Sequence, residues 1–146
     1  MLHYATVPVT AFQQNCSIVW DDASGEAAII DPGGDLDVIK DALNQLGVKL
    51  TQIWVTHAHI DHAGACAELA EAKGLPIVGP HRGDQFWIDA LAEQGHRFGL
   101  GPARPFTPTR WLVDGDTVKL GEHVFDVRHC PGHTPGHVVF HSKTLN

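Results

Sequence analysis

The chain of 146 residues is 43% hydrophobic and 18% charged, the proportions of one ordinary globular domain. Its formal net charge of −7 argues against nucleic acid as a partner, because phosphate binding needs clustered Lys and Arg. No apolar run approaches the ~20 residues that span a bilayer, and residues 1–6 lack the basic and apolar parts of a secretory signal. We therefore expect a cytoplasmic protein that binds no membrane.

Hydrophobic patterning predicts strands and a helix in the first third of the chain. Leu36, Ile39 and Leu43 recur at steps of three and four, which gives one apolar helical face. Asp35 and Gly47 are typical of a helix start and a helix end. The strands expected around this helix lie at residues 3–9, 15–21, 27–31 and 52–55.

The remaining elements follow the same patterning rules. They are a helix at 62–73, a strand at 75–78, a helix at 83–94, a loop at 95–108, a hairpin of 117–120 with 123–127, and a strand at 137–141. Strands and helices that alternate between flanking strand pairs favour a layered α/β structure with a mixed sheet, in a single domain spanning residues 1–146.

The loop after the strand at 52–55 carries four metal-competent side chains within six residues. In extended chain, side chains two apart point the same way, so His57, His59 and Asp61 can converge on one side. His62 turns to another direction as the helix begins, which suits a second metal ion about 3.5–4 Å from the first. This density indicates a metal site better than a set of solvated loop histidines.

A second fragment, at residues 129–137, offers a ligand far along the chain. Pro131 and Gly132 fix a turn that holds His133 in a defined direction. With His57 and His59 it would make a site of three nitrogens and one open position. The alternative is a turn histidine that merely hydrogen-bonds to backbone.

Four segments together resemble the metallo-β-lactamase superfamily, and within it the short glyoxalase II-like (hydroxyacylglutathione hydrolase-like) enzymes. These segments are Ile30-Asp31-Pro32-Gly33, His57-x-His59-x-Asp61-His62, Asp114-Gly115-Asp116 and Pro131-Gly132-His133-Thr134-Pro135-Gly136-His137. The resemblance implies an αββα sandwich, of class α/β (α+β), with a metal site at one sheet edge. It implies first-site ligands His57, His59 and His133, and second-site ligands Asp61 and His62.

The chain departs from the family at its end. The family completes its site with a metal-bridging Asp and a last His, and no acid or histidine follows His141 here. The sequence thus resembles the N-terminal two-thirds of such an enzyme, and by this resemblance we expect a C-terminally incomplete sandwich. An unpaired sheet edge would then favour aggregation or dimerisation, although the sequence leaves the oligomeric state open.

The resemblance implies hydrolysis of a thioester of the S-2-hydroxyacylglutathione type, so the expected partner is a small glutathione conjugate. Metal-bound hydroxide would attack the acyl carbon, and Asp61 would take or orient its proton. The cofactor is one or two divalent ions, zinc before iron or manganese, because imidazole and carboxylate suit all three. Two alternatives stay open: a mononuclear-iron oxidoreductase similar to the persulfide dioxygenases, and a catalytically impaired metal-binding fragment.

Several other residues carry weaker expectations. Asp31 either orients a ligand or forms a turn, and Asp114-Gly115-Asp116 is interpreted as a hairpin signal rather than an acid pair. His129 and His137 are expected to support the His133 loop. Three arginines could bind an anionic substrate, although a solvated loop is the favoured interpretation; they are Arg97, Arg104 and Arg110.

Three widely spaced cysteines, without a Cys-x-x-Cys pair, predict the reduced thiols of a cytosolic protein; they are Cys16, Cys66 and Cys130. Cys130 precedes His133 by three residues, a spacing that can bind zinc. Because Pro131 separates the two, we interpret Cys130 as a buried thiol.

Overall fold

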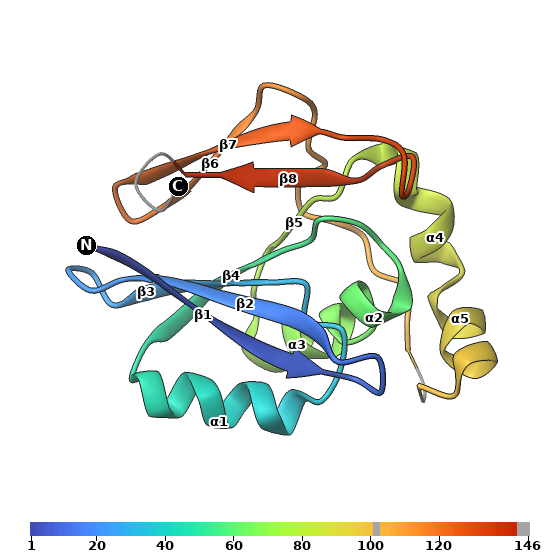
Figure 1. The fold of residues 1–146 in the computed structure, drawn as a ribbon, viewed down its shortest axis with the longest axis horizontal. Coiled ribbons are helices and arrows are strands. Elements are labelled where there is room, and N and C mark those ends of the chain that lie inside the picture. The colour runs from blue at the N-terminus through green and yellow to red at the C-terminus, as the bar shows by residue number, and fades with distance from the viewer. Residues whose placement is uncertain (101–102, 143–146) are drawn as a thin grey trace.

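Two β-sheets face each other, and helices cover the outer side of the larger sheet (Figure 1). The computed structural model describes residues 1–100 and 103–142. Sheet A has the strand order β1 (Leu2–Val9), β2 (Gln14–Asp21), β3 (Glu26–Ile30), β4 (Lys49–Trp54) and β5 (Ile77–Val78). Sheet B has the order β6 (Thr117–Leu120), β7 (His123–His129) and β8 (Val138–His141).

The strand pairing confirms the mixed sheet. β1, β2 and β3 pair antiparallel, whereas β3 with β4 and β4 with β5 pair parallel. Sheet B is antiparallel throughout. In the described part of the chain β8 lies at an edge of sheet B; dimerisation through this edge stays a prediction.

The helices confirm the predicted positions but not all of the predicted lengths. They are α1 (Leu36–Leu46), α2 (Ile60–Ala63), α3 (Cys66–Lys73), the 3-10 helix η1 (Arg82–Asp84), α4 (Gln85–Asp89) and α5 (Leu91–Phe98). The single helix predicted at 62–73 is wrong, because Gly64 and Ala65 separate α2 from α3. A Cβ on Gly64 would lie 2.6 Å from the Gly33 carbonyl oxygen, and Ala65 N donates to Pro32 O. The chain thus turns here to pack on the segment after β3.

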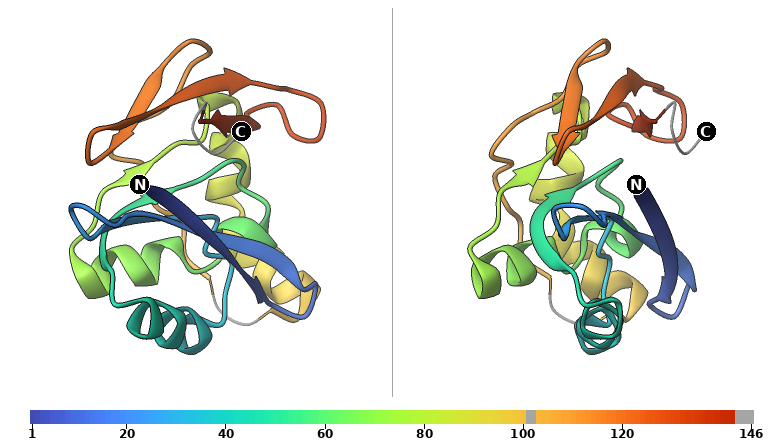
Figure 2. Two further views of the ribbon diagram at one scale, coloured as in Figure 1. Left: turned by 60° about the vertical axis from the view of Figure 1, so that its left-hand side comes forward. Right: turned by 90° about the vertical axis from the view of Figure 1, so that its left-hand side faces the viewer.

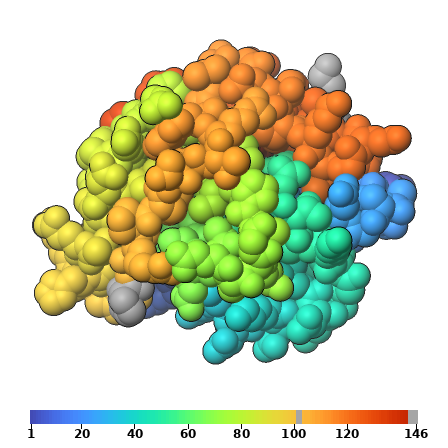
Figure 3. Space-filling model, turned by 180° about the vertical axis from the view of Figure 1, so that it is seen from behind, coloured from blue at the N-terminus to red at the C-terminus, as the bar shows by residue number. Residues whose placement is uncertain are grey.

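The single helix predicted at 83–94 is also wrong, because Ala90 separates α4 from α5 and α5 continues to Phe98. Part of the predicted loop is ordered against sheet A: residues 103–113 run beside β5 across the back of the molecule (Figure 3). Thr109 N donates to Ile77 O, and Leu112 is fully buried. Asp35 precedes α1 as predicted, but its carboxylate accepts from Thr10 N instead of capping the helix.

Strand alternation builds two hydrophobic cores, one on each face of sheet A. Ile18, Ile29 and Ile53 pack against the helices. Their neighbours Val19, Ala28 and Trp54 face sheet B, because successive strand residues point to opposite faces. The side views show the resulting layers, with helices below sheet A and sheet B above it (Figure 2).

Trp54 anchors the core between the sheets. It is fully buried, makes an edge contact with Phe125 at 4.9 Å between ring centroids, and stacks on Phe140 at 5.1 Å. Both sheets are therefore held in a fixed relation at the strand that leads into the histidine loop. Among the described residues, no helix is long and apolar enough to cross a bilayer.

Candidate metal centre

Three loops meet at one end of the two sheets. β3 and β4 are parallel neighbours, so Asp31 and the loop from Thr56 emerge at the same edge. A Cβ on Gly33 would lie 1.7 Å from the Asp61 carbonyl oxygen. Only glycine therefore lets these two loops touch. The loop between β7 and β8 brings His133 from sheet B.

The three histidines expected at the first site converge. The metal-competent atoms of His57, His59 and His133 all lie within 4.8 Å of one another. His57 is 3% exposed, and its Nε2 is buried without a hydrogen-bond partner, while its Nδ1 lies 2.9 Å from Thr56 Oγ1. An unpaired buried nitrogen is costly, so this donor set fits a divalent ion bound at Nε2.

A second group of metal-competent atoms overlaps the first and consists of Asp31, His57 and His62, again within 4.8 Å. Asp61, expected at the second site with His62, is not in this group. His62 Nδ1 lies 2.9 Å from Asp31 Oδ2, and His62 Nε2 lies 3.5 Å from Asp61 Oδ2. The Asp31 carboxylate also accepts from Thr56 N at 2.7 Å and from Thr56 Oγ1 at 2.5 Å. These contacts favour an orienting role for Asp31 over that of a turn residue.

The electrostatics hold most of the cluster in the form that binds metals. Burial, followed by the charges of neighbouring imidazoles, lowers the pKa of His57 to about 2. Burial likewise lowers the pKa of His59 and of His137. Burial also opposes the charged form of His62, but the hydrogen bond and charge of Asp31, with the charge of Asp61, together raise its pKa. Neutral imidazole is the metal ligand, so His57 and His59 are ready to bind at neutral pH.

A cavity of about 460 Å³ opens beside the histidines. His59 and Asp61 line it together with three aromatic rings, which are those of Phe12, Trp87 and Phe98. The guanidinium of Arg97 lines the cavity and lies over the Phe98 ring at 5.9 Å. Within the described part of the chain, no carboxylate forms an ion pair with Arg97.

The other two arginines are occupied elsewhere. Arg104 donates two hydrogen bonds of 2.8 Å to Glu71, and Arg110 donates to Thr117 O at 3.0 Å. Of the three arginines noted in the sequence, Arg97 is thus the one that lines the cavity. Arg97 is exposed to solvent as expected, but it lies on helix α5 and not in a loop.

The loop that carries His133 is supported as expected. His129 Nε2 lies 2.8 Å from Pro135 O, and its ring stacks on His81 at 3.9 Å. The His137 ring packs on His57 at 4.6 Å. Asp114 lies in a turn before β6, where its carboxylate accepts from His129 N.

The interpretation of Cys130 as a buried thiol is wrong: its side chain is exposed, whereas Cys16 and Cys66 are buried. The sharp turn at Pro131 and Gly132 carries Cys130 to the surface.

Sequence reasoning also missed Asp84 and Trp87. Asp84 is fully buried, and the His59 ring makes an edge contact with Trp87 at 4.9 Å. Neither residue lies at a metal-ligand spacing from the histidines in the sequence, so no local pattern could have predicted its place near the site.

Comparison with known proteins fits this geometry. The family model described as the metallo-beta-lactamase superfamily matches residues 9–145. The chain belongs to the metallo-β-lactamase superfamily. Two solved structures of similar fold are BLEG-1, a B3 metallo-beta-lactamase, with 28% identity and a TM-score of 0.85, and TTHA1623 in a di-iron-bound form, with 32% identity and a TM-score of 0.84. This chain is covered to 98% and 97%, and each of those chains to 68%.

Among curated relatives, a hydroxyacylglutathione hydrolase GloC of Haemophilus influenzae is 44% identical over 95% of this chain. A hydroxyacylglutathione hydrolase of Maricaulis maris is 36% identical over 85% of it. The chain spans 66% of the first relative's length and 41% of the second's. The expected metallo-β-lactamase-type fold is thereby confirmed, and the matched relatives are longer than this chain.

Proposed function

We propose that this chain belongs to a metal-dependent hydrolase of thioesters of the S-2-hydroxyacylglutathione type. His57, His59 and His133 would hold one divalent ion, zinc before iron or manganese, and Asp61 with His62 would hold a second. The observation that carries the proposal is the unpaired, buried Nε2 of His57 inside a group of three converging imidazoles. The hydrolase activity in the names of the two curated relatives supports the substrate class.

The residues of the site divide the chemical work. A bound divalent ion would lower the pKa of water and polarise the acyl carbonyl group. Asp61 lines the cavity and lies 3.5 Å from His62, where its carboxylate can hold or accept the proton of the attacking water. The aromatic rings that line the cavity would exclude bulk water from the reacting thioester. Arg97 would bind a glutathione carboxylate.

The test is removal of a ligand. The substitutions His57→Ala and His59→Ala should abolish zinc uptake, measured by elemental analysis, and lower thioesterase kcat/KM by at least the 10–100-fold typical of disturbed metal sites. His96→Ala, in the exposed face of α5, is the matched control and should behave like the unchanged protein. Variants that keep both metal and activity would show that the assignment is wrong.

The two ligand groups share His57, so they do not by themselves distinguish one ion from two. The hydrolase is preferred over the mononuclear-iron oxidoreductase because two curated relatives are named hydroxyacylglutathione hydrolases. Oxygen uptake by iron-loaded protein with glutathione persulfide would reverse that preference. Metal binding without turnover of either substrate would support the impaired fragment. Cys16, Cys66 and Cys130 are free thiols, and the cytoplasm proposed as the compartment keeps thiols reduced.

A further inference from the structure

Asp84, the last residue of η1, is a fully buried carboxylate outside the expected ligand set. It accepts three hydrogen bonds. Ala58 N donates to Oδ2 at 2.9 Å, Thr134 Oγ1 donates to Oδ2 at 2.9 Å, and Gly136 N donates to Oδ1 at 2.7 Å. Its own backbone position is fixed, since Asp84 N donates to His81 O.

The three donors come from the two histidine loops. Ala58 lies between His57 and His59, and Thr134 directly follows His133. One side chain therefore joins the loop from sheet A to the loop from sheet B. Among the described residues, this is the carboxylate that connects both parts of the three-histidine group through hydrogen bonds.

Close backbone packing makes this connection rigid. A Cβ on Gly136 would lie 2.4 Å from Asp84 N and 2.6 Å from His81 O, so the His133 loop rests directly on η1. Gly83 is also close to the loop, because a Cβ there would lie 3.0 Å from Pro135 O. The carboxylate thus has no room to leave its three donors without moving a loop.

The charge of Asp84 is also placed to act on the site. Within the described residues no Lys or Arg forms an ion pair with Asp84, and a buried unpaired charge is costly unless hydrogen bonds or a nearby cation compensate it. Its charge reaches His59 and His137, where it opposes the lowering of their pKa values by burial. A cation among the histidines would complete the compensation.

We propose that Asp84 is a positioning residue of the metal centre, which holds the His57–His59 loop and the His133 loop at ligating distance. This inference depends on the proposed metal site. It requires that loss of the carboxylate weakens metal binding and changes the coordination geometry, beyond any change in the stability of the metal-free protein.

The experiment compares Asp84→Asn, Thr134→Val and Thr134→Ser with the unchanged chain, and Asp89→Asn, exposed on α4, is the matched control. Zinc dissociation constants come from chelator competition, and visible spectra of the Co²⁺-loaded proteins report ligand geometry. We expect zinc binding weaker by about 10–100-fold for Asp84→Asn, a smaller loss for Thr134→Val, and recovery in Thr134→Ser. The Co²⁺ spectrum should change in the first two variants only.

Thr134→Val keeps the test valid if Asp84→Asn does not fold, because it removes one donor of three. The inference is overturned if the folded variants bind zinc within twofold of the unchanged protein with the same Co²⁺ spectrum, even where their metal-free melting temperatures fall. An unchanged protein that takes up neither ion would contradict the proposed function itself, and the role of Asp84 with it.

Discussion

Two side chains near this site, those of His57 and Arg97, are suited to bind opposite charges. Buried His57 has a free Nε2 and a pKa lowered to about 2, first by burial. Arg97 lines the cavity beside the histidines, and no carboxylate among the described residues forms an ion pair with it. The imidazole of His57 can bind a cation, and the guanidinium of Arg97 can bind an anion. Under the proposed function, this pair of groups would suit a negatively charged substrate.

Arg97→Gln should raise KM for a glutathione thioester about 10-fold or more with little change in kcat, because a hydrogen bond to a charged group contributes about 1.5–3 kcal/mol. Steady-state kinetics measure both parameters. Arg104→Gln, which breaks the exposed pair with Glu71, should leave KM unchanged. An equal KM for Arg97→Gln and the unchanged chain would exclude the guanidinium from substrate binding.

Elements of the fold pack closely at this site where the chain has glycines, because glycine has no side chain. Gly33 and Gly64 bring the segment after β3 against the loop from β4, and Gly136 brings the loop before β8 against η1. Glycine at these points serves close backbone approach rather than turn geometry. These contacts hold the histidine loop against the segment after β3, and the loop before β8 against η1.

Gly33→Ala should destabilise the fold by roughly 1–3 kcal/mol, as overpacking does in other buried sites, because the new Cβ would overlap the Asp61 carbonyl group. Zinc affinity should fall as well, since the histidine loop must move. Urea unfolding and chelator competition measure the two effects. Gly34→Ala is the control, because its Cβ would meet only the Thr10 methyl group at 3.0 Å. Equal losses in both variants would contradict the argument.

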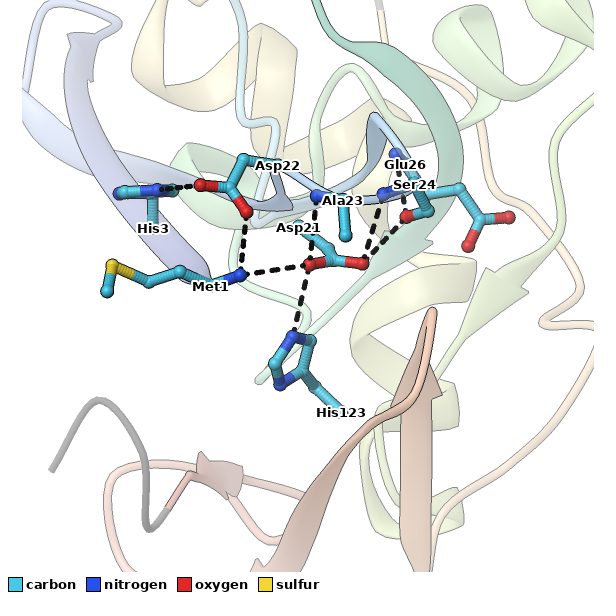
Figure 4. Close-up of polar contacts among 8 residues, drawn as sticks. All are labelled: Met1, His3, Asp21, Asp22, Ala23, Ser24, Glu26 and His123. Carbon is cyan, nitrogen blue, oxygen red and sulfur yellow. Dashed lines mark hydrogen bonds and ion pairs between the residues drawn. The ribbon is translucent and has the colours of Figure 1, made fainter.

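At the scale of the whole molecule, a second set of polar contacts joins the two sheets, away from the metal-competent histidines (Figure 4). His123 of β7 reaches Asp21 of β2 at 3.2 Å, and the N-terminal amine of Met1 lies 2.6 Å from Asp22. Ser24 Oγ donates to Asp21 at 2.9 Å. The hydrogen bond from Ser24, opposed by burial and reinforced by His123, lowers the pKa of Asp21 to about 2. Asp21 thus connects sheet A to sheet B.

Asp21→Asn should lower the free energy of unfolding near pH 7 and weaken its acid dependence. The folded pKa of Asp21, about 2, lies below its ordinary value of 3.8. In that window the unfolded state binds more protons, and stability present above pH 3.8 is lost as pH falls toward 2. Urea unfolding from pH 7 to pH 3 measures the slope. Asp41→Asn, exposed on α1, should keep the slope, and an unchanged slope in Asp21→Asn would contradict this role.

The sequence by itself indicated the family, most element positions and the convergence of His57, His59 and His133. The family follows from the resemblance of four segments to known motifs. The element positions follow from local periodicity, and the convergence follows from ligand spacing along an extended loop and from a turn whose residues restrict it. It misplaced the break at Gly64, the end of α5 and the exposure of Cys130, since packing against distant backbone decides each of them.

Only the tertiary structure decided which groups support the ligands. Asp31 contacts His62, Asp84 contacts both histidine loops, and three aromatic rings line the same cavity as Asp61. These contacts join residues that no periodicity relates, because a folded chain brings together positions that are far apart in sequence. The physical reason is that the spacing of metal ligands is a local property of the sequence. The residues that hold those ligands in place are brought to them only when the two sheets pack together.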